Sequence, residues 1–209
     1  RKGVKLNATV FIRRSNDVIP EITGVSEDGL GLAIDIIPPT NCPNCGQPTE
    51  IRISDSGTET VHCINDSCGL TKQIAHYVSR DALNIEGLSE KTIEKLIDLE
   101  LLKSISSIYY LSNPKAKEIM IKQDGFGIKS YNNLVQAIEK SKQCKLANFL
   151  LGLGIEGIGK GTSAKLVEHF KREDSLHTLN NIIQAKHSDI LKVDDCGEVI
   201  ANSIIEWFS

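Results

Sequence analysis

The chain has 209 residues, of which 40% are hydrophobic and only 5% aromatic, and its formal net charge is −3. This composition favours several small aliphatic cores over one large aromatic core. The acidic balance argues against a partner held by bulk positive charge. Because no apolar run approaches the length of about 18 residues that a membrane span needs, and the N-terminus lacks the pattern of a signal peptide, we expect a cytoplasmic protein without a membrane partner.

The first motif along the chain is a group of four cysteines with the spacing Cys42-x2-Cys45-x17-Cys63-x4-Cys68. In a reducing compartment this spacing is typical of a structural zinc site, because four thiolates complete a closed tetrahedral shell. The segments TEIRI and TVHCI predict two short strands of a hairpin, joined by a turn at SDSGT, that carries the two halves of the site. Two disulfides or four unrelated thiols are the alternative, which a reducing compartment disfavours.

The remaining cysteines and a neighbouring histidine are interpreted as residues without a metal. His62 adjoins Cys63 and would point away from it in a strand, so we expect a surface histidine. Cys144 and Cys196 lack nearby cysteine partners in the sequence. We therefore expect each to act as a small apolar packing residue.

The stretch 73–209 repeats one pattern four times. Each copy has a small-apolar-small triplet, loosely kept in the last, followed by apolar residues at i, i+3, i+4 spacing, which predicts an amphipathic helix. We expect helices throughout the stretch, interrupted by Asn113-Pro114 and the glycine turns, and packed around the middle residue of each triplet. The triplets begin 38, 32 and 38 residues apart: Gly87-Leu88-Ser89, Gly125-Phe126-Gly127, Gly157-Ile158-Gly159 and Asp195-Cys196-Gly197.

The repeated pattern predicts helix-hairpin-helix units. Glycines in the turn permit positive φ and let another chain approach closely, since no Cβ intervenes. The turn amides and the first N–H groups of the following helix form a concavity that suits a phosphate oxygen and needs little side-chain charge. The candidate phosphate-binding residues are Gly87, Gly125, Gly127, Gly157, Gly159 and Gly197, with Lys129 and Lys160 as accessory cations.

The four hairpins are not expected to bind equally. One glycine pair between two helices is more often a plain turn, and it is the register of four that favours phosphate binding. The first and fourth hairpins have each lost one glycine, and Asp195 adds a negative charge to the fourth. We therefore expect the second and third hairpins to bind more strongly.

Two further motifs are interpreted as coincidences, so no catalytic residue is assigned. GIEGIGKGT resembles a phosphate-binding loop, but Gly161 stands where the magnesium-binding hydroxyl should be. That loop also needs a preceding strand, whereas the residues before Gly154 have helical spacing. Lys122-Gln123-Asp124-Gly125 matches the K-x-D-G motif of nucleotidyltransferases, without the companion motifs of their nucleotide pocket.

Four blocks, in order along the chain, resemble bacterial NAD-dependent DNA ligases. FIRRSNDVIPEI resembles the segment that closes the family's OB-fold domain, with Ser15-Asn16 in place of Ala-Gly. CPNCG followed by CINDSC resembles its four-cysteine zinc finger, with Gly69 where proline is common. IAHYVSRDALNIEGLSEKTIEKL is similar to the junction into its helix-hairpin-helix domain, and LLGLGIEGIGKGTSAKLVEHF to a hairpin of that domain.

The resemblance implies a multidomain, mainly α fold with an incomplete N-terminal β segment. Residues 1–40 would be the last strands of the OB-fold domain, 41–72 the zinc finger, and 73–209 a tandem helix-hairpin-helix domain. In this family these domains wrap nicked double-stranded DNA without regard to sequence, and the hairpins grip backbone phosphates through the minor groove. The implied cofactor of this chain is one structural zinc.

The resemblance also implies a division of labour. NAD and magnesium would serve only the parent enzyme's missing domains, which include the adenylation domain, so we expect this chain neither to adenylate nor to seal nicks in replication and repair. We expect a monomer associated with the bacterial nucleoid. The alternatives are a DNA-binding module of another repair or recombination protein, such as a nuclease subunit, and a zinc-containing protein-interaction module, which the acidic last 59 residues would favour.

Overall fold

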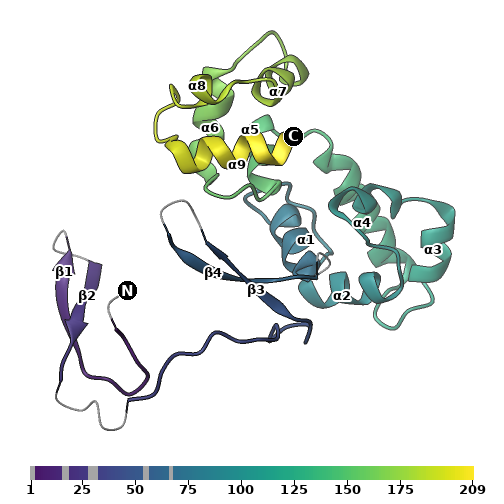
Figure 1. Ribbon diagram of the computed structural model, residues 1–209. Coiled ribbons are helices and arrows are strands. Elements are labelled where there is room, and N and C mark those ends of the chain that lie inside the picture. The colour runs from purple at the N-terminus through teal and green to yellow at the C-terminus, as the bar shows by residue number, and fades with distance from the viewer. Residues whose placement is uncertain (1–2, 16–18, 28–32, 54–56, 66–67) are drawn as a thin grey trace. The chain divides into compact units, whose positions relative to one another are not determined.

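The structure is a computed structural model that describes residues 3–15, 19–27, 33–53, 57–65 and 68–209. It divides into two compact units, Arg1–Asp66 and Ser67–Ser209. Among the described residues, the first unit contains the strands and the second contains the helices (Figure 1). Two parts of the sequence analysis lie outside the described residues. They are Asn16, which belongs to the pair that stands in place of the family's Ala-Gly, and the first three residues of the predicted turn SDSGT.

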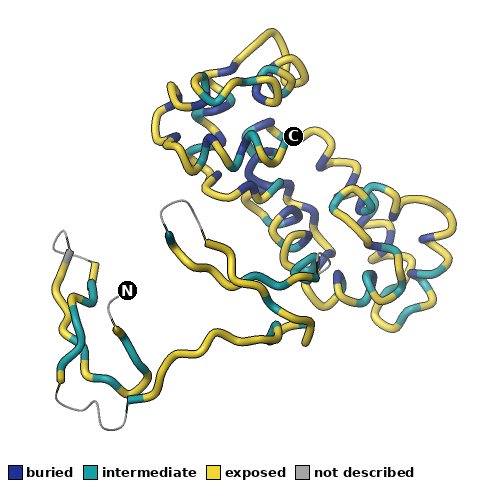
Figure 2. The backbone as a smooth tube through the Cα atoms, viewed as in Figure 1, coloured by how far each residue is buried: buried dark blue, intermediate teal, exposed yellow. Residues whose placement is uncertain are grey.

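The first unit holds two antiparallel hairpins. β1 (Val10–Ser15) pairs with β2 (Ile19–Val25), and β3 (Thr49–Ile53) pairs with β4 (Glu59–Cys63), which confirms the hairpin predicted around TEIRI and TVHCI. None of the described residues of this unit is buried (Figure 2). Phe11, for example, is 58% exposed. Since isolated two-stranded hairpins are marginal in water, the stabilising cores lie in the second unit.

The second unit is built from short helices. None of those described is long and apolar enough to cross a membrane. The described chain is mainly helical with two small sheets, which confirms this part of the predicted fold class. The elements are α1 (Leu70–Val78), α2 (Glu90–Asp98), the 3-10 helix η2 (Ile105–Tyr110), α3 (Pro114–Met120), α4 (Ile128–Ser141), α5 (Leu146–Gly152), α6 (Lys160–His169), α7 (Ser175–Ile183), α8 (His187–Ile190) and α9 (Glu198–Phe208).

The helices are shorter than the sequence pattern predicted. After α2 the chain turns at Glu100, which has a φ of 56°, and the Leu101 amide donates to the Leu96 carbonyl over 2.9 Å. This is the bonding of a Schellman cap, which usually contains glycine, so the sequence carried no stop signal here. Between α4 and α5, Lys145 adopts an extended conformation with a ψ of 143°. These two breaks add to the interruptions expected at Asn113-Pro114 and the glycine turns.

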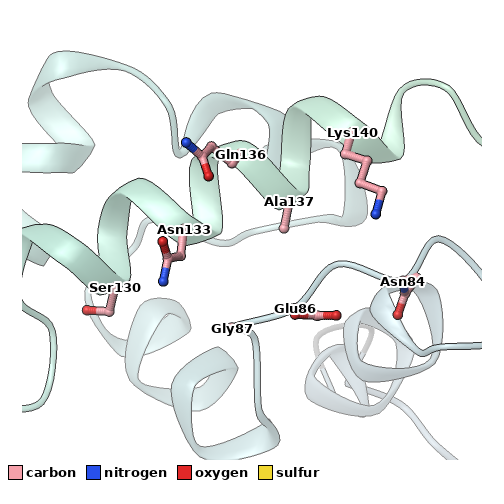
Figure 3. A pocket seen from close by; sticks show the side chains of 8 residues that line it. All are labelled: Asn84, Glu86, Gly87, Ser130, Asn133, Gln136, Ala137 and Lys140. Carbon is pink, nitrogen blue, oxygen red and sulfur yellow. The ribbon is translucent and has the colours of Figure 1, made fainter.

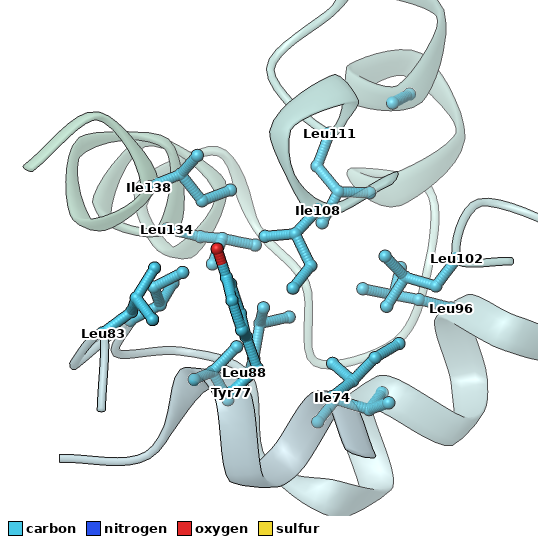
Figure 4. Close-up of a cluster of buried hydrophobic side chains, with 14 of the residues drawn as sticks. Ile74, Tyr77, Leu83, Leu88, Leu96, Leu102, Ile108, Leu111, Leu134 and Ile138 are labelled. Carbon is cyan, nitrogen blue, oxygen red and sulfur yellow. The ribbon is translucent and has the colours of Figure 1, made fainter. Parts of the chain in front are cut away.

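Two hydrophobic clusters form the core of the second unit. The first gathers side chains from α1, α2, η2, α3 and α4 (Figure 4), and the second gathers side chains from α5 to α9. Phe149 and Leu153, in and just after α5, pack against both clusters, so α5 joins them.

The middle residues of the four triplets pack as predicted, with one difference. Leu88, Ile158 and Cys196 are buried, at 6%, 7% and 6% exposure. Phe126 is only half-buried and packs against the first cluster. Cys144 is half-buried and packs against the same cluster, as predicted.

Replacing Leu166 with alanine should lower the free energy of unfolding by about 2–5 kcal/mol. The side chain is 0% exposed in the second cluster, so its loss leaves a cavity. Leu176→Ala is the matched control on α7, because this leucine is 65% exposed, and its cost should stay below about 0.5 kcal/mol. Urea denaturation followed by circular dichroism measures both, and equal losses would contradict the assignment of this core.

Candidate metal centre and nucleic-acid interface

The four cysteines predicted as metal ligands lie together. Their Sγ atoms are all within 4.8 Å of one another, and those of Cys45 and Cys63 are 3.5 Å apart. A tetrahedral zinc with Zn–S bonds of about 2.3 Å holds its sulfurs about 3.8 Å apart, so the cluster has the size for such an ion. His62 is not a member of the cluster; its Nε2 lies 2.8 Å from the Thr60 hydroxyl.

The local backbone explains how the cysteines converge. The Cys42 amide donates to the Gln47 carbonyl over 2.7 Å, and the Gly46 amide donates back to the Cys42 carbonyl over 2.9 Å. This closes the CPNCG segment into a tight turn. Cys63 ends β4, and the Asn65 amide donates to its Sγ over 3.4 Å. A donated hydrogen bond favours the thiolate that a metal requires.

Four turns between helices share one backbone conformation. The first residue of each predicted triplet has a positive φ, and the third residue is the N-cap of the following helix. The sequence register of the repeat is thus also its structural register. The first residues are Gly87 (98°), Gly125 (81°), Gly157 (80°) and Asp195 (65°). The N-caps are Ser89 for α2, Gly127 for α4, Gly159 for α6 and Gly197 for α9.

The three N-cap glycines are not required by the fold. Gly127, Gly159 and Gly197 have extended backbone angles that any residue adopts. A Cβ added at any of them would meet no heavy atom within 4 Å among the described residues. Open space in front of an N-terminal helix turn lets an external acceptor reach its N–H groups.

Side-chain capping separates the first hairpin from the others. No side chain caps α4, α6 or α9, so the first N–H groups of these helices keep their bonding capacity. In α2, by contrast, the Ser89 hydroxyl accepts from the Thr92 amide over 3.2 Å. The first hairpin therefore already satisfies one of the donors that a phosphate would use.

The two predicted accessory lysines lie in the first turns of their helices. Lys129 of α4 is exposed. Lys160 begins α6, and its Nζ lies 3.1 Å from Oδ1 of Asp81, both side chains being about three-quarters exposed. Exposed ion pairs contribute little to stability, so Lys160 can exchange this partner for a phosphate.

Two other lysines, which the sequence analysis missed, hold neighbouring turns. Lys165 of α6 donates a hydrogen bond to the Asp195 carboxylate, which raises the pKa of the lysine. Lys95 of α2 donates to the Asp124 carbonyl over 2.9 Å. Each lysine is the sixth residue after the N-cap of its helix. The helix of the first hairpin thus contacts the backbone of the second turn, and the helix of the third hairpin contacts a carboxylate of the fourth turn.

The hairpins are adjacent in two pairs. A Cβ on Gly87 would lie 3.6 Å from Leu134 of α4, and a Cβ on Gly157 would lie 2.7 Å from Ile200 of α9. The first hairpin thus packs against the helix of the second, and the third against the helix of the fourth. Gly157 needs to be glycine on two grounds, since its φ is also positive.

Two of the cavities among the described residues border the first and third hairpins. The first, of about 450 Å³, is bordered by the first hairpin and α4 (Figure 3), and its lining includes two charged residues, Glu86 and Lys140. Its lining residues are Asn84, Glu86, Gly87, Ser130, Asn133, Gln136, Ala137 and Lys140. The second, of about 400 Å³, lies between α1, the third hairpin and Trp207 of α9, whose side chain is 48% exposed.

The two motifs interpreted as coincidences lie in helical surroundings. The segment GIEGIGKGT follows helix α5, so the strand that a phosphate-binding loop requires is absent at that place in the described structure. Lys122 forms an exposed ion pair with Glu118 at 2.8 Å, which lowers the pKa of the glutamate. Asp124 and Gly125 form the turn before α4.

Comparison with known proteins agrees with this architecture. A model of the helix-hairpin-helix motif matches residues 148–209, which contain the third and fourth turns. The second unit is therefore of the helix-hairpin-helix class in at least this part.

Over its full length, the chain is similar to bacterial DNA ligases. It is 45% identical to the DNA ligase of Clostridium novyi (strain NT), 44% identical to DNA ligase 2 of Clostridium acetobutylicum and 43% identical to the DNA ligase of Finegoldia magna. It covers 30%, 29% and 30% of these proteins, so it spans about a third of the length of the relatives it matches. The resemblance to the C-terminal part of DNA ligases, predicted from the order of the motifs, is confirmed.

The cysteine cluster predicts about one zinc ion per chain. Cys45→Ser should reduce the zinc content strongly, because serine is a poor zinc ligand. Cys144→Ser should leave it unchanged, since that sulfur packs against the first hydrophobic cluster. Metal analysis of the purified variants by mass spectrometry measures both contents, and equal zinc in the two variants would rule out this metal centre.

Proposed function

We propose that this chain is the part of an NAD-dependent DNA ligase that holds nicked duplex DNA while the break is sealed in replication and repair. The ligase activity is proposed for the parent protein because the relatives are named DNA ligases. The observation that carries the DNA-holding role is the pair of uncapped helix starts at Gly127 and Gly159, which open into unobstructed space.

The chemistry of these helix starts suits a DNA backbone. First-turn N–H groups and the helix dipole bind a phosphate oxygen without a large cationic surface. Lys129 and Lys160 add one positive charge to each of the two turns. Because backbone amides contact phosphates and not base edges, binding should be independent of sequence. A chain with a net charge of −3 can bind DNA in this way.

The domain assignment follows from the same proposal. Residues 73–209 act as a tandem helix-hairpin-helix domain, with Gly87, Gly125, Gly157 and Asp195 at equivalent places in its turns. Residues 41–72 act as a zinc finger whose single ion is structural, since four cysteines leave no open ligand position. Residues 1–40 act as the last strands of an OB-fold domain. The chain works as a monomer on the bacterial chromosome in the cytoplasm.

Catalysis would rest with other parts of the parent protein. AMP transfer from NAD, with magnesium, needs a nucleophilic lysine in a nucleotide pocket. The K-x-D-G lysine of this chain lies on an exposed helix end, paired with Glu118. The chain by itself would hold nicked DNA without sealing it.

Replacing Gly127 and Gly159 together with valine should weaken the binding of nicked duplex by roughly tenfold or more, because a hydrogen bond to a charged group contributes about 1.5–3 kcal/mol. The branched side chains would cover the first-turn amides. Since neither position is crowded, zinc content and helical circular dichroism should stay unchanged. Fluorescence anisotropy with labelled DNA at moderate salt measures the affinity.

The control for this experiment is Gln143→Val, which adds an exposed valine between α4 and α5, away from the turns. It should bind like the wild type. If the wild type binds neither nicked nor intact duplex, the proposed function is wrong. If the double glycine variant binds as tightly as the control, the function can stand but the hairpins are not the grip.

A further inference from the structure

We propose that Glu90 and Glu198 keep DNA phosphates out of the first and fourth hairpins, so that each pair of adjacent hairpins contacts DNA through one member only. This inference rests on the DNA-binding function proposed above. It concerns the residue that begins the helix after each turn, which is Glu90 in α2, Ile128 in α4, Lys160 in α6 and Glu198 in α9.

A glutamate at this place occupies the electrostatic position of the phosphate. The N-terminal end of a helix carries partial positive charge, which stabilises a carboxylate in the first turn as it would stabilise a phosphate. Glu90 and Glu198 are the acidic first-turn residues of α2 and α9, while the first turns of α4 and α6 contain none. A phosphate that approached the first or fourth hairpin would therefore meet a like charge.

Each glutamate also contacts a basic side chain of the preceding helix. Lys72 of α1 lies 2.7 Å from the Glu90 carboxylate, and His187 of α8 lies 3.0 Å from that of Glu198. In the third hairpin the arrangement is reversed. There the cation, Lys160, begins the helix of the hairpin, and its acidic partner, Asp81, lies outside that hairpin.

A second, independent feature disfavours phosphate at each of these two hairpins. In the first, the Ser89 hydroxyl already accepts a hydrogen bond from a first-turn amide. In the fourth, Asp195 lies within the turn itself, and its carboxylate forms an ion pair with Lys165. The second and third hairpins combine a glycine N-cap, no acidic residue in the first turn and a first-turn lysine.

The packing of the hairpins turns this difference into a pattern. The first and second are adjacent, as are the third and fourth, through the contacts of Gly87 with Leu134 and of Gly157 with Ile200. Each pair thus has one member open to phosphate and one closed. We expect two phosphate grips in this unit and not four, which keeps the counterion release on DNA binding small.

The test compares four single variants that change the net charge equally. Glu90→Gln and Glu198→Gln remove the hairpin carboxylates, and Glu94→Gln and Glu206→Gln remove exposed carboxylates further along the same two helices. The hairpin variants should bind nicked duplex about two- to fivefold more tightly than their controls. This ratio of affinities corresponds to the free energy with which a charge in the first turn interacts with the helix end. They should also show a steeper loss of affinity with salt.

The outcomes separate this inference from the proposed function. If wild-type binding depends on Gly127 and Gly159 but all four glutamine variants gain equally, the gain is a bulk charge effect and the inference is wrong. If only the hairpin variants gain, it is supported. If the wild type does not bind duplex DNA, the proposed function fails and this inference fails with it. If the wild type binds but binding does not depend on Gly127 and Gly159, the function can stand, whereas this inference is wrong because the hairpins are not the grip.

Discussion

An α-helix cannot satisfy its own first N–H groups, and the second unit of this protein places four such helix starts behind sharp turns. The turns are possible because their first residue takes a positive φ, at three glycines and at Asp195. Asp is one of the few other residues that tolerate this conformation. Other contacts in the unit hold these turns. The two hydrophobic clusters fix the helices, and Lys95 and Lys165 tie the second and fourth turns to a neighbouring helix.

Under the proposed function, this arrangement reconciles an acidic chain with a polyanionic partner. Binding by fixed backbone dipoles needs accurate placement of a few amides, whereas binding by a cationic face needs an excess of lysine and arginine. The placement is provided by buried residues such as Leu88 and Ile158 beneath the turns. Side-chain charges then adjust the result, because a single carboxylate in the first turn is close enough to counteract the helix end.

Local features were predictable from the sequence, and contacts between helices were not. The cysteine spacing predicted the metal cluster, and the triplet spacing predicted the turns, since both depend on a few neighbouring residues. The end of α2 was missed because Glu100 adopts a left-handed conformation without being glycine. The pairing of Lys165 with Asp195 joins residues 30 positions apart, so it depends on how two helices pack. The need for glycine at Gly157 likewise comes partly from Ile200 of α9, a contact that no local pattern encodes.

The second cavity gives the protein a spectroscopic property. Trp207 is the single tryptophan of the chain, and its half-exposed indole faces the cavity that α1 and the third hairpin enclose. All indole emission therefore originates at the junction of α9, α1 and the third hairpin. A shift in that emission would report a rearrangement around the third hairpin. The second hairpin, whose helix α4 borders the other cavity, would contribute no tryptophan signal.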